Sequence, residues 1–446
     1  MSAVPFLGHR DRSAVVAWRG AQALTVADFL AEVAAVAGAL PDRGFLVNLC
    51  GDRCRFAVGL AAALLRSQVS LLPPSHAPEM LRALKQRYIG LYALSDGGAR
   101  TEVLETIEYP ASTRGEEEID MPAFAPSQQA AIAFTSGSTG EPTPHAKSWG
   151  KLALGAIGEA QCLGLDGAGP VTLVGTVPAQ HMYGLESTVL LALQNGLSLH
   201  AARPFYPADI RAALEQIAGE RVLVTTPVHL RALLAEESSL PRLRLILCAT
   251  APLPPDLAAE AEARYGAPLH EIYGFTEAGM VATRRTTVGE QWHALPGVRL
   301  WRDDQGVRVA GGHVEREVGF TDVVELEDEH TFVLHGRSAD LVNIAGKRSS
   351  LAYLNQQLMS IQGVEDGVFF MPEDTKGATT RLIAFVVAPR LPRKVLMSAL
   401  RERVDPAFLP RPVYYVDRLP RNATGKLSRE ALCRLAEGAA ARGPDV

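Results

Sequence analysis

The chain has 446 residues, and its hydrophobic content of 47% is enough to fill the cores of two or three domains. Its net charge of −5 argues against a dedicated nucleic-acid-binding protein. The N-terminal residues lack the charged and apolar segments of a signal peptide, and the longest apolar run, residues 56–65, is too short to cross a bilayer. We therefore expect a cytoplasmic protein with no membrane span and no nucleic-acid partner. Five scattered cysteines, with no histidine at ligand spacing, indicate reduced thiols.

Strand and helix signals alternate through the first part of the chain. Thr25 can cap a helix over residues 26–40, whose apolar positions recur at helical spacing up to Pro41. Strand patterns at 45–50 and 69–72 flank an alanine-rich helix at 53–66. This order is typical of a parallel α/β sheet. The polar residues 94–128 are predicted to form an irregular connection.

The alternation resumes after residue 129 and changes near the end of the chain. Helices are predicted at 149–162, 228–236 and 254–265, and strands at 130–134, 171–177, 222–226, 243–249 and 268–272. Alternating apolar residues in 311–333 indicate a small β region, and short strands around one amphipathic helix at 395–404 indicate a small α+β domain. The expected fold class is therefore α/β, with a large multi-sheet N-terminal region and a small mobile α+β C-terminal domain.

A loop rich in hydroxyls and glycine follows the apolar run 130–134. Glycines let backbone N–H groups turn toward an anion, and the carboxyl end of a strand is where α/β domains bind ligands. The loop contains neither a Walker A motif nor a nucleophile elbow. Its sequence Thr-Ser-Gly-Ser-Thr-Gly-Glu-Pro resembles the phosphate loop of the adenylate-forming enzymes, which include acyl-CoA synthetases, aryl-acid ligases, luciferases and nonribosomal adenylation domains. The resemblance implies a nucleotide-binding role for Thr135, Ser136, Gly137, Ser138, Thr139 and Gly140.

A second motif, residues 273–277, follows the predicted strand 268–272. An aromatic face can stack on a purine, and a carboxylate beside a hydroxyl suits Mg²⁺ bound to nucleotide phosphates. The segment matches the family motif Tyr-Gly-x-Thr-Glu, with Gly274 at the fixed glycine. The resemblance implies that Tyr273 stacks on adenine, Thr276 contacts the α-phosphate and Glu277 holds Mg²⁺. Thr250 lies in a stretch that resembles the loop lining the family's adenine and acyl pockets.

Two further segments resemble the family's ribose and hinge motifs. Asp322 stands at the place of the ribose-binding aspartate, although the glycine that usually precedes it is missing. Arg337 matches the hinge arginine and would reach the ribose and phosphate side. Ala339 replaces the usual acidic hinge residue, and only Asp340 remains. The resemblance implies a nucleotide- and acid-binding domain at 1–337 and a lid at 338–446.

The last motif, residues 419–426, is similar to the family's catalytic-lysine loop, which makes Lys426 the expected catalytic cation. His181 lies in a stretch that resembles the acyl-pocket motif in which such a residue flanks the carboxylate. The phosphate loop departs from the family because Thr143 stands where a lysine is common and Pro144 replaces a glycine. Unless His145 or Lys147 contributes, we expect a hydroxyl and amide cradle, with the positive charge supplied by Mg²⁺ on Glu277 and by Lys426.

The resemblance implies an acid–thiol ligase that forms AMP. A carboxylic acid, either aryl, hydroxyaryl or acyl, attacks the α-phosphate of Mg·ATP, and the acyl-adenylate passes its acyl group to the pantetheine thiol of CoA or of an acyl carrier protein. Residues 338–446 carry 16 Lys and Arg against 11 Asp and Glu, a balance that suits either acceptor.

Three alternatives stay open at this point. An amino-acid adenylating enzyme needs a partner for the substrate ammonium, and Glu186 is the one candidate near the acyl-pocket motif. A γ-phosphoryl transferase would release ADP instead of AMP. A degenerate member of the family would bind acid or nucleotide without full turnover.

Overall fold

The computed structural model describes residues 2–110, 120–136, 142–236, 239–320, 322–337, 341–344, 347–372, 382–422 and 425–442. Its contacts divide the chain into two compact units, each described here by itself. The larger unit contains Met1–Ala249, Pro255–Gly319 and Asp328–Thr331, and the smaller unit contains Thr250–Pro254, Phe320–Glu327 and Phe332–Val446. The proposed boundary at 337/338 stays a prediction.

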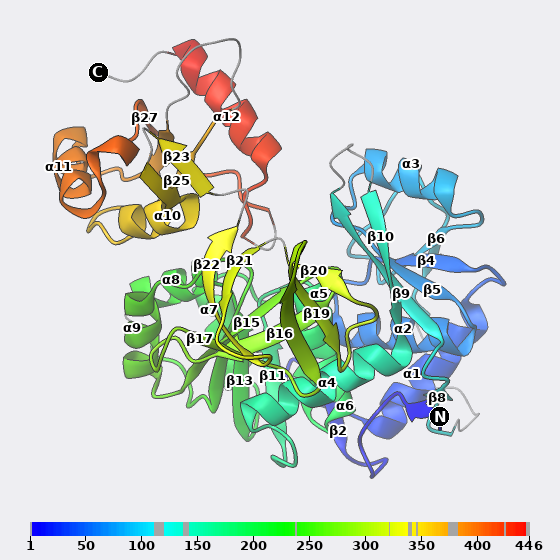
Figure 1. Cartoon of the computed structure of the whole chain (residues 1–446). Helices are drawn as coiled ribbons and strands as arrows, with labels where there is room; N and C mark the ends of the chain where they lie inside the picture. Colours follow the sequence, from blue (N-terminus) through cyan, green and yellow to red (C-terminus); the bar gives the residue numbers. More distant parts are fainter. Residues whose placement is uncertain are drawn as a thin grey trace. The chain divides into compact units, whose positions relative to one another are not determined.

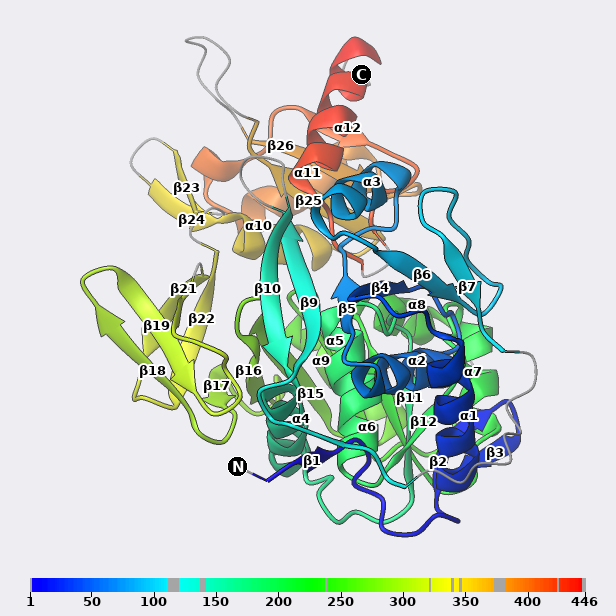
Figure 2. The same cartoon turned by 90° about the vertical axis from the view of Figure 1, so that its right-hand side faces the viewer.

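The first sheet of the larger unit has the order β10-β9-β5-β4-β6-β7 (Figure 1). Its strands are β4 (Phe45–Asn48), β5 (Val69–Leu72), β6 (Tyr92–Ser95), β7 (Thr106–Glu108), β9 (Gln129–Ser136) and β10 (Pro142–Ser148). All of them run parallel except β10, which lies at the edge and pairs antiparallel with β9. Figure 2 shows β9 and β10 as a long hairpin. The expected irregular connection at 94–128 is wrong in part, because it contains β7, part of β6 and the two-residue strand β8 (Ala123–Phe124).

The same part of the chain forms three helices: α1 (Val26–Ala39), α2 (Arg53–Leu65) and α3 (Pro78–Arg87). The predicted cap of α1 is confirmed, since Thr25 accepts a hydrogen bond from the N–H of Asp28 and the Asp28 carboxylate accepts one from the N–H of Thr25. α2 is almost completely buried, and its alanines and Gly59 let it pack closely within the unit.

The second sheet of the larger unit runs in the order β17-β16-β15-β14-β13-β11-β12-β2-β3. Its strands are β2 (Val15–Arg19), β3 (Gln22–Thr25), β11 (Val171–Gly175), β12 (Ser198–His200), β13 (Glu220–Thr225), β14 (Leu245–Cys248), β15 (Leu269–Phe275), β16 (Gly279–Arg284) and β17 (Gln291–Ala294). The strands from β2 to β15 in that order are parallel, whereas β16 turns back antiparallel on β15.

The same unit contains the helices α4 (Trp149–Leu163), α7 (Pro207–Glu215), α8 (Pro227–Ala235) and α9 (Pro255–Tyr265). It also contains a short pair of strands, β1 (Val4–Pro5) with β8 (Ala123–Phe124), and a three-stranded sheet of β18 (Val298–Asp303), β19 (Gly306–Gly311) and β20 (Val318–Gly319). One sequence-based strand end is wrong. β15 continues to Phe275, so Tyr273 and Gly274 lie within the strand and not after it.

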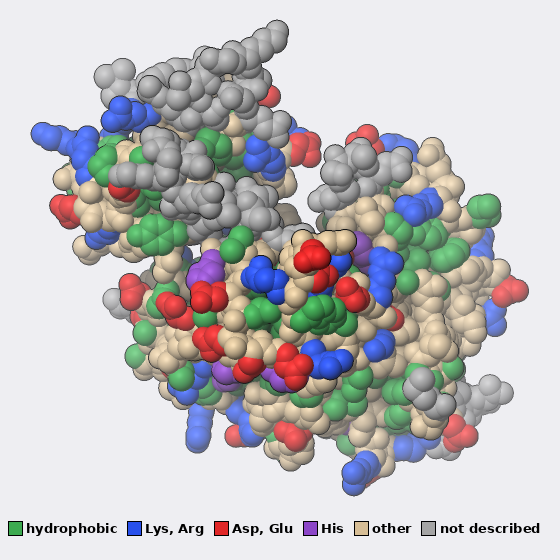
Figure 3. All heavy atoms as spheres, viewed as in Figure 1, with side chains coloured by type: hydrophobic (Ala, Val, Ile, Leu, Met, Phe, Trp, Pro, Cys, Tyr) green, Lys and Arg blue, Asp and Glu red, His purple; other side chains and the backbone are tan. Residues whose placement is uncertain are grey.

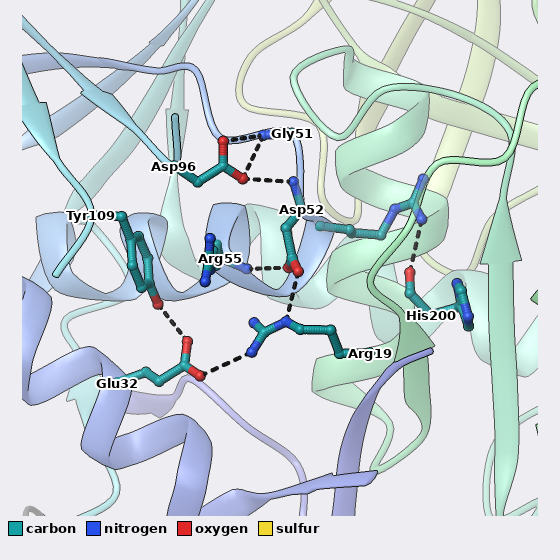
Figure 4. Close-up of polar contacts among 9 residues, drawn as sticks. Arg19, Glu32, Gly51, Asp52, Arg55, Asp96, Tyr109 and His200 are labelled. Carbon is teal, nitrogen blue, oxygen red and sulfur yellow. Dashed lines mark hydrogen bonds and ion pairs between the residues drawn. The ribbon is translucent and has the colours of Figure 1, made fainter. Parts of the chain in front are cut away.

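A polar network, partly buried, joins the N-terminal elements (Figure 4). Nε of Arg19 in β2 donates to Asp52, the N-cap residue of α2, at 2.8 Å, and its Nη1 donates to Glu32 of α1 at 3.4 Å. The Tyr109 hydroxyl donates to the other oxygen of Glu32 at 2.5 Å. The Asp96 carboxylate accepts from the N–H of Asp52 at 2.9 Å. These bonds fix the start of α2 relative to α1 and β2.

Arg53, the first residue of α2, is fully buried and binds the ends of two strands. Its Nη1 donates to the carbonyls of His200 and Ala202, and its Nη2 donates to those of Gly175 and Val177, at 2.8 to 3.0 Å. Burial lowers the pKa of Arg53 to about 10, so the guanidinium stays charged at pH 7. It therefore anchors the chain where it leaves β11 and β12.

The smaller unit is an α+β assembly. Its strands are β21 (Asp322–Leu326), β22 (Thr331–Arg337), β23 (Leu341–Ile344), β24 (Lys347–Ser350), β25 (Asp366–Phe370), β26 (Ile383–Val387) and β27 (Val413–Tyr415), and its helices are α10 (Leu351–Met359), α11 (Arg393–Arg403) and α12 (Arg429–Arg442). The sequence predicted α11 but missed α10 and α12. The expected fold class, with a large multi-sheet region and a smaller C-terminal domain, is confirmed.

All five cysteines are free thiols. Within the part of the chain that the structure describes, no helix combines the length and the apolar character needed to cross a membrane.

Candidate functional site

The β9–β10 hairpin and the turn between β15 and β16 meet at Glu277. The hydroxyl of Thr135, near the end of β9, lies 2.9 Å from Nε2 of His145 in β10. The same nitrogen lies 3.7 Å from Oε1 of Glu277. His145 therefore joins the base of the predicted phosphate loop to the predicted metal ligand. Burial lowers the pKa of His145, although the Glu277 carboxylate opposes this, so the imidazole is mainly neutral at pH 7.

The Glu277 side chain is 35% exposed, which leaves its carboxylate accessible to a ligand. Among the described residues, no group of three or more His, Cys, Asp and Glu side chains gathers as a metal cluster. A single accessible carboxylate fits Mg²⁺, which commonly binds one or two carboxylates and takes its remaining ligands from substrate phosphates and water.

Lys147 lies on β10 two residues after His145 and is 3% exposed. Its Nζ donates to the backbone carbonyl of Glu277 at 3.1 Å. Beside it is a small cavity of about 10 Å³, which is room for roughly one water molecule. The cavity is lined by Lys147, Lys151, Leu152, Glu186, Ala278, His313 and Glu315. Charged side chains, of which Lys147 and Glu186 are buried, thus line a cavity beside the Glu277 turn.

Tyr273 is held among aromatic side chains. Its ring is 9% exposed, and its centre lies 5.6 Å from that of Trp292 and 6.2 Å from that of Phe275. Gly274 is the next residue of β15, and Thr276 begins the turn that carries Glu277. The orientation of the Tyr273 ring is therefore fixed by packing. Its stacking on adenine stays a prediction.

His181 stands directly before the short helix α5 (Met182–Gly184), and the π-helix η1 (Leu185–Leu190) and α6 (Leu191–Gln194) continue from it. The preceding loop is fixed by Gln180, whose Nε2 donates to the carbonyl of Cys50 at 2.6 Å. It also approaches α5 so closely that a Cβ at Gly184 would lie 1.9 Å from the Pro178 carbonyl oxygen. His181 therefore occupies a rigid position, and its contact with a carboxylate stays a prediction.

Asp322 and Arg337 are brought together in the smaller unit. They are directly opposite in the antiparallel pairing of β21 with β22. Thr250, assigned to the same unit, has a φ of 83°, a left-handed conformation that is rare for a residue other than glycine. Such backbone strain is often found at ligand sites. The nucleotide contacts of all three residues stay predictions.

Lys426 is exposed on a tight turn of the smaller unit. Its N–H donates to Oδ1 of Asn422 at 2.9 Å. Arg421 fixes the start of the turn, because two of its nitrogens donate to the Asp366 carboxylate at 2.8 and 2.7 Å and a third donates to the carbonyl of Gly425. The turn therefore has a rigid base that presents Lys426 to solvent.

Several predicted residues lie outside the described part of the chain. These are Gly137, Ser138, Thr139 and Gly140 of the phosphate loop and Ala339 and Asp340 of the hinge motif. Ser136 is described as the last residue of β9, paired with Pro142.

The sequence did not reveal two polar residues beside this site, His313, which is buried, and Glu315, which is partly buried. His313 Nε2 donates to the carbonyl of Met280, and Oε1 of Glu315 accepts from the N–H and the hydroxyl of Ser148. Both residues come from a region that the sequence placed only in a small β segment. Burial of an isolated His or Glu has no sequence signal of its own, because the same residue types usually lie at the surface.

Two family descriptions match this chain. Residues 6–318 match the family described as AMP-binding enzyme, and residues 354–426 match the AMP-binding enzyme C-terminal domain. The chain belongs to the AMP-binding enzyme family. The resemblance to adenylate-forming enzymes, based on the motifs from Thr135 to Lys426, is therefore confirmed.

Curated relatives of this AMP-binding enzyme have names that describe CoA ligases. A 2-succinylbenzoate–CoA ligase of Geobacillus sp. (strain WCH70) is 28% identical over 352 residues, which is 69% of each chain. A 4-coumarate–CoA ligase of Rhodobacter capsulatus is 29% identical over 275 residues, covering 62% of this chain and 67% of that protein.

Solved structures agree in fold with this AMP-binding enzyme. The o-succinylbenzoate CoA synthetase of Bacillus subtilis, solved with its acyl-adenylate intermediate, aligns with a TM-score of 0.80 over 94% of this chain and 95% of that chain, at 21% identity. A benzoate CoA ligase of Burkholderia xenovorans aligns with a TM-score of 0.76 over 94% and 96%, at 17% identity. At such identities the agreement concerns the fold.

Proposed function

We propose that this enzyme uses Mg·ATP to convert an aryl, hydroxyaryl or acyl carboxylic acid into an acyl-adenylate and then transfers the acyl group to a pantetheine thiol. The class of reaction, an AMP-forming acid–thiol ligase, follows from membership of the family and from relatives that are named CoA ligases. The sequence-based expectation of this class is confirmed, and with it the expectation that the enzyme uses ATP, Mg²⁺ and CoA chemistry.

One observation carries the proposal at the level of the site. Thr135, His145 and Glu277 form a connected group in which the base of the phosphate loop lies next to an accessible carboxylate. The loop binds the phosphates that leave as pyrophosphate, and Glu277 binds the metal. Mg²⁺, when bound, neutralises charge on the phosphates. No protein nucleophile is required, because the substrate carboxylate itself attacks phosphorus.

The chain's own residues then have distinct tasks. Tyr273 offers a ring to the base, Asp322 and Arg337 bind the ribose side, and Thr276 contacts the α-phosphate. Lys426, carried by a lid of residues 338–446, meets the charge that develops as carboxylate oxygen and phosphate join. His181 orients the substrate carboxylate from its rigid loop.

The structure favours a plain acid over an amino acid as the substrate. Glu186, the candidate ammonium partner, is 6% exposed, and it accepts a hydrogen bond from the N–H of Met280 with Lys147 as an attractive charge nearby. A buried carboxylate that already accepts a backbone N–H, with a lysine charge nearby, is poorly available to a substrate ammonium. We therefore place the substrate among aryl, hydroxyaryl and fatty acids.

Either CoA or an acyl carrier protein can supply the thiol. Exposed basic residues of the smaller unit, among them Arg390, Arg393, Lys394 and Arg401, suit the phosphates of CoA and also the acidic surface of a carrier protein. The choice between the two is part of the proposal's test.

The test is a screen of aryl, hydroxyaryl and fatty acids, with amino acids as comparison, for ATP–pyrophosphate exchange and for the nucleotide product. We expect exchange with one class of plain acid and formation of AMP, followed by thioester formation on CoA or carrier protein. Release of ADP would assign a γ-phosphoryl transferase. Binding of ATP and acid with no exchange for any acid would identify a degenerate member of the family.

A further inference from the structure

The backbone of the Glu277 turn is held from inside the protein by three buried side chains. Lys147 donates from Nζ to the carbonyl of Glu277 at 3.1 Å. Three residues later, Met280 donates its N–H to the Glu186 carboxylate and accepts at its carbonyl from Nε2 of His313 at 2.5 Å. Both ends of the segment 277–280 are thus fixed to side chains that take no part in the proposed chemistry.

Of these three side chains, Lys147 is the one whose burial most needs an explanation. The residue is 3% exposed, and burial lowers the pKa of its ammonium. The attractive charges that oppose this are Glu186 first, then Glu315 and Glu277. A buried ammonium without opposite charges is strongly destabilising. An apolar side chain could be buried at this position at a lower cost in free energy, yet the chain has a lysine here.

Glu186 serves as the principal counter-charge. Its carboxylate lies so close to Gly279 that a Cβ there would be 2.7 Å from Oε1, and the φ of Gly279 is 82°, which also favours glycine. Burial raises the pKa of Glu186 to about 7, and Lys147 opposes that rise. Glu186 comes from η1, the helix that follows the acyl-pocket motif, so the lysine connects elements that are far apart in sequence.

The position of Lys147 on β10 decides what it acts on. Residues 145 and 147 lie on the same face of a strand, because side chains alternate with a period of two. His145 contacts the Glu277 carboxylate and Lys147 contacts the Glu277 carbonyl. One strand therefore holds both ends of this residue, although the family's usual loop lysine is replaced by Thr143.

We propose that Lys147 is a positioning residue that holds Glu277 in place as the metal ligand, with Glu186 as its counter-ion. The inference rests on the proposed function, because it takes Glu277 to be the ligand of Mg²⁺. Lys147 acts through the backbone of Glu277 and not on the phosphates. Partners that orient a metal ligand typically change metal affinity by about 10- to 100-fold when they are removed.

The test measures metal binding directly in the full-length protein. Mn²⁺ binding in the presence of a non-hydrolysable ATP analogue is followed by electron paramagnetic resonance, alongside metal-free binding of the analogue. For Lys147→Met we expect about 10-fold or greater weakening of Mn²⁺ binding, with little change in metal-free nucleotide affinity. Lys147→Arg, which retains a donor and a charge, should recover part of the loss.

Lys151→Met is the matched control. Lys151 lines the same cavity and also donates to a backbone carbonyl, but to that of Gly312 at 2.6 Å and, within the described part of the chain, not to that of Glu277. The Mn²⁺ affinity of Lys151→Met should stay within about twofold of the native value, since Lys151 is not among the described hydrogen-bond partners of Glu277. If Lys147→Met does not fold, Lys147→Gln replaces it, because glutamine keeps an N–H donor without the charge. For this variant we expect Mn²⁺ binding to weaken by about threefold or more.

The outcomes separate this inference from the function on which it rests. Unchanged Mn²⁺ affinity in Lys147→Met, together with a loss in Glu277→Gln, overturns the positioning role and leaves the proposed function intact. Unchanged affinity in Glu277→Gln overturns the metal assignment itself. A fall in metal-free nucleotide affinity for Lys147→Met shows that the lysine acts on the phosphates, and the inference is then wrong.

Discussion

Lys426 combines an exposed position with a rigid base, since Arg421 and Asn422 hold the turn from both sides. A cation that meets charge in the transition state should affect turnover far more than substrate binding. We expect Lys426→Ala to lower the rate of ATP–pyrophosphate exchange by about 10²-fold or more, the scale seen when one preorganised stabilising group is removed. The measurement is steady-state exchange with the acid identified by the screen.

Arg418→Ala provides the control for this variant. Arg418 is also an exposed cation near the same turn, so a general change of charge in the region would affect both variants. Exchange that survived in Lys426→Ala at the native rate would remove Lys426 from the catalytic residues.

Glu159 of α4 gives the clearest pH-dependent prediction. Its carboxyl is completely buried, and burial raises its pKa to about 8, assisted by the neighbouring Glu186. Between about pH 4.5 and 8 the unfolded chain loses this proton while the folded chain keeps it, so folding stability contributed by Glu159 falls as the pH rises. We therefore expect Glu159→Gln to gain stability relative to the native protein across this range, by at most about 1.4 kcal/mol per pH unit.

Thermal unfolding at pH 5, 6, 7 and 8 measures the effect. Glu260→Gln, on the exposed face of α9, should follow the native curve at every pH. A difference between Glu159→Gln and the native protein that did not change with pH would contradict the raised pKa.

At the residue scale, the sequence predicted a site from side chains whose chemistry is visible in a motif, and their roles stay predictions. A motif can be read in the sequence without knowing how the chain packs, and this holds for Tyr273, Glu277 and Lys426. The burial of Lys147 and Glu186 could not be predicted, because a lysine and a glutamate are usually solvated, whereas the fold buries both beside one cavity. The sequence could name them as candidates but could not show what they contact.

At the scale of elements, β10 is the strand that the sequence missed most clearly. It contains Pro142 and Pro144, which cannot donate to a ladder and normally argue against a strand. The strand forms because it lies at the edge of its sheet, where one side of the backbone needs no partner. The parallel strands β4, β5 and β13 were predicted well, because strands buried on both faces are continuous apolar runs.

The network around Glu32 permits a test of how elements are joined. Tyr109 lies after β7, and its hydroxyl donates to Glu32 of α1, a carboxylate that Arg19 of β2 also contacts. Tyr109→Phe leaves this buried carboxylate with one donor fewer. Because a hydrogen bond to a charged group contributes about 1.5–3 kcal/mol, we expect a loss of that size in the free energy of unfolding, measured with urea.

Tyr88→Phe is the matched control. Tyr88 packs against Phe45 and Phe134, and among the described residues its hydroxyl makes no hydrogen bond. Its free energy of unfolding should change by less than about 0.5 kcal/mol. Equal effects of the two substitutions would show that the Tyr109 hydroxyl does not hold these elements together.

At the scale of the whole molecule, charge divides the chain unequally. Residues 338–446 carry a net charge of +5, and the remaining residues carry −10. Figure 3 shows acidic and basic side chains interspersed on the visible face of the larger unit, and both kinds are also seen on the part of the smaller unit that is coloured. The basic character of residues 338–446 was visible in the sequence, because charge depends on composition and not on packing.

This asymmetry leads to a prediction about the thiol acceptor. Arg393 and Lys394 are exposed at the start of α11, next to Val395, which is 51% exposed. A basic surface around an apolar residue attracts an acidic partner at long range and gives it a contact at short range. If the acceptor is a carrier protein, the double reversal Arg393→Glu/Lys394→Glu should lower kcat/KM for that protein by about 10-fold or more at low ionic strength.

The same variant should leave ATP–pyrophosphate exchange unchanged, because adenylation does not involve the acceptor. The loss should shrink as salt is raised, since screening weakens interactions between exposed charges. Arg10→Glu/Arg82→Glu, an equal change of charge at exposed positions of the larger unit, should keep native kcat/KM for the carrier protein. If the α11 variant transferred the acyl group to a carrier protein at the native rate, this surface would be excluded as the docking site. If the enzyme showed no activity toward carrier proteins, and the variant lowered kcat/KM for CoA, CoA would be identified as the acceptor.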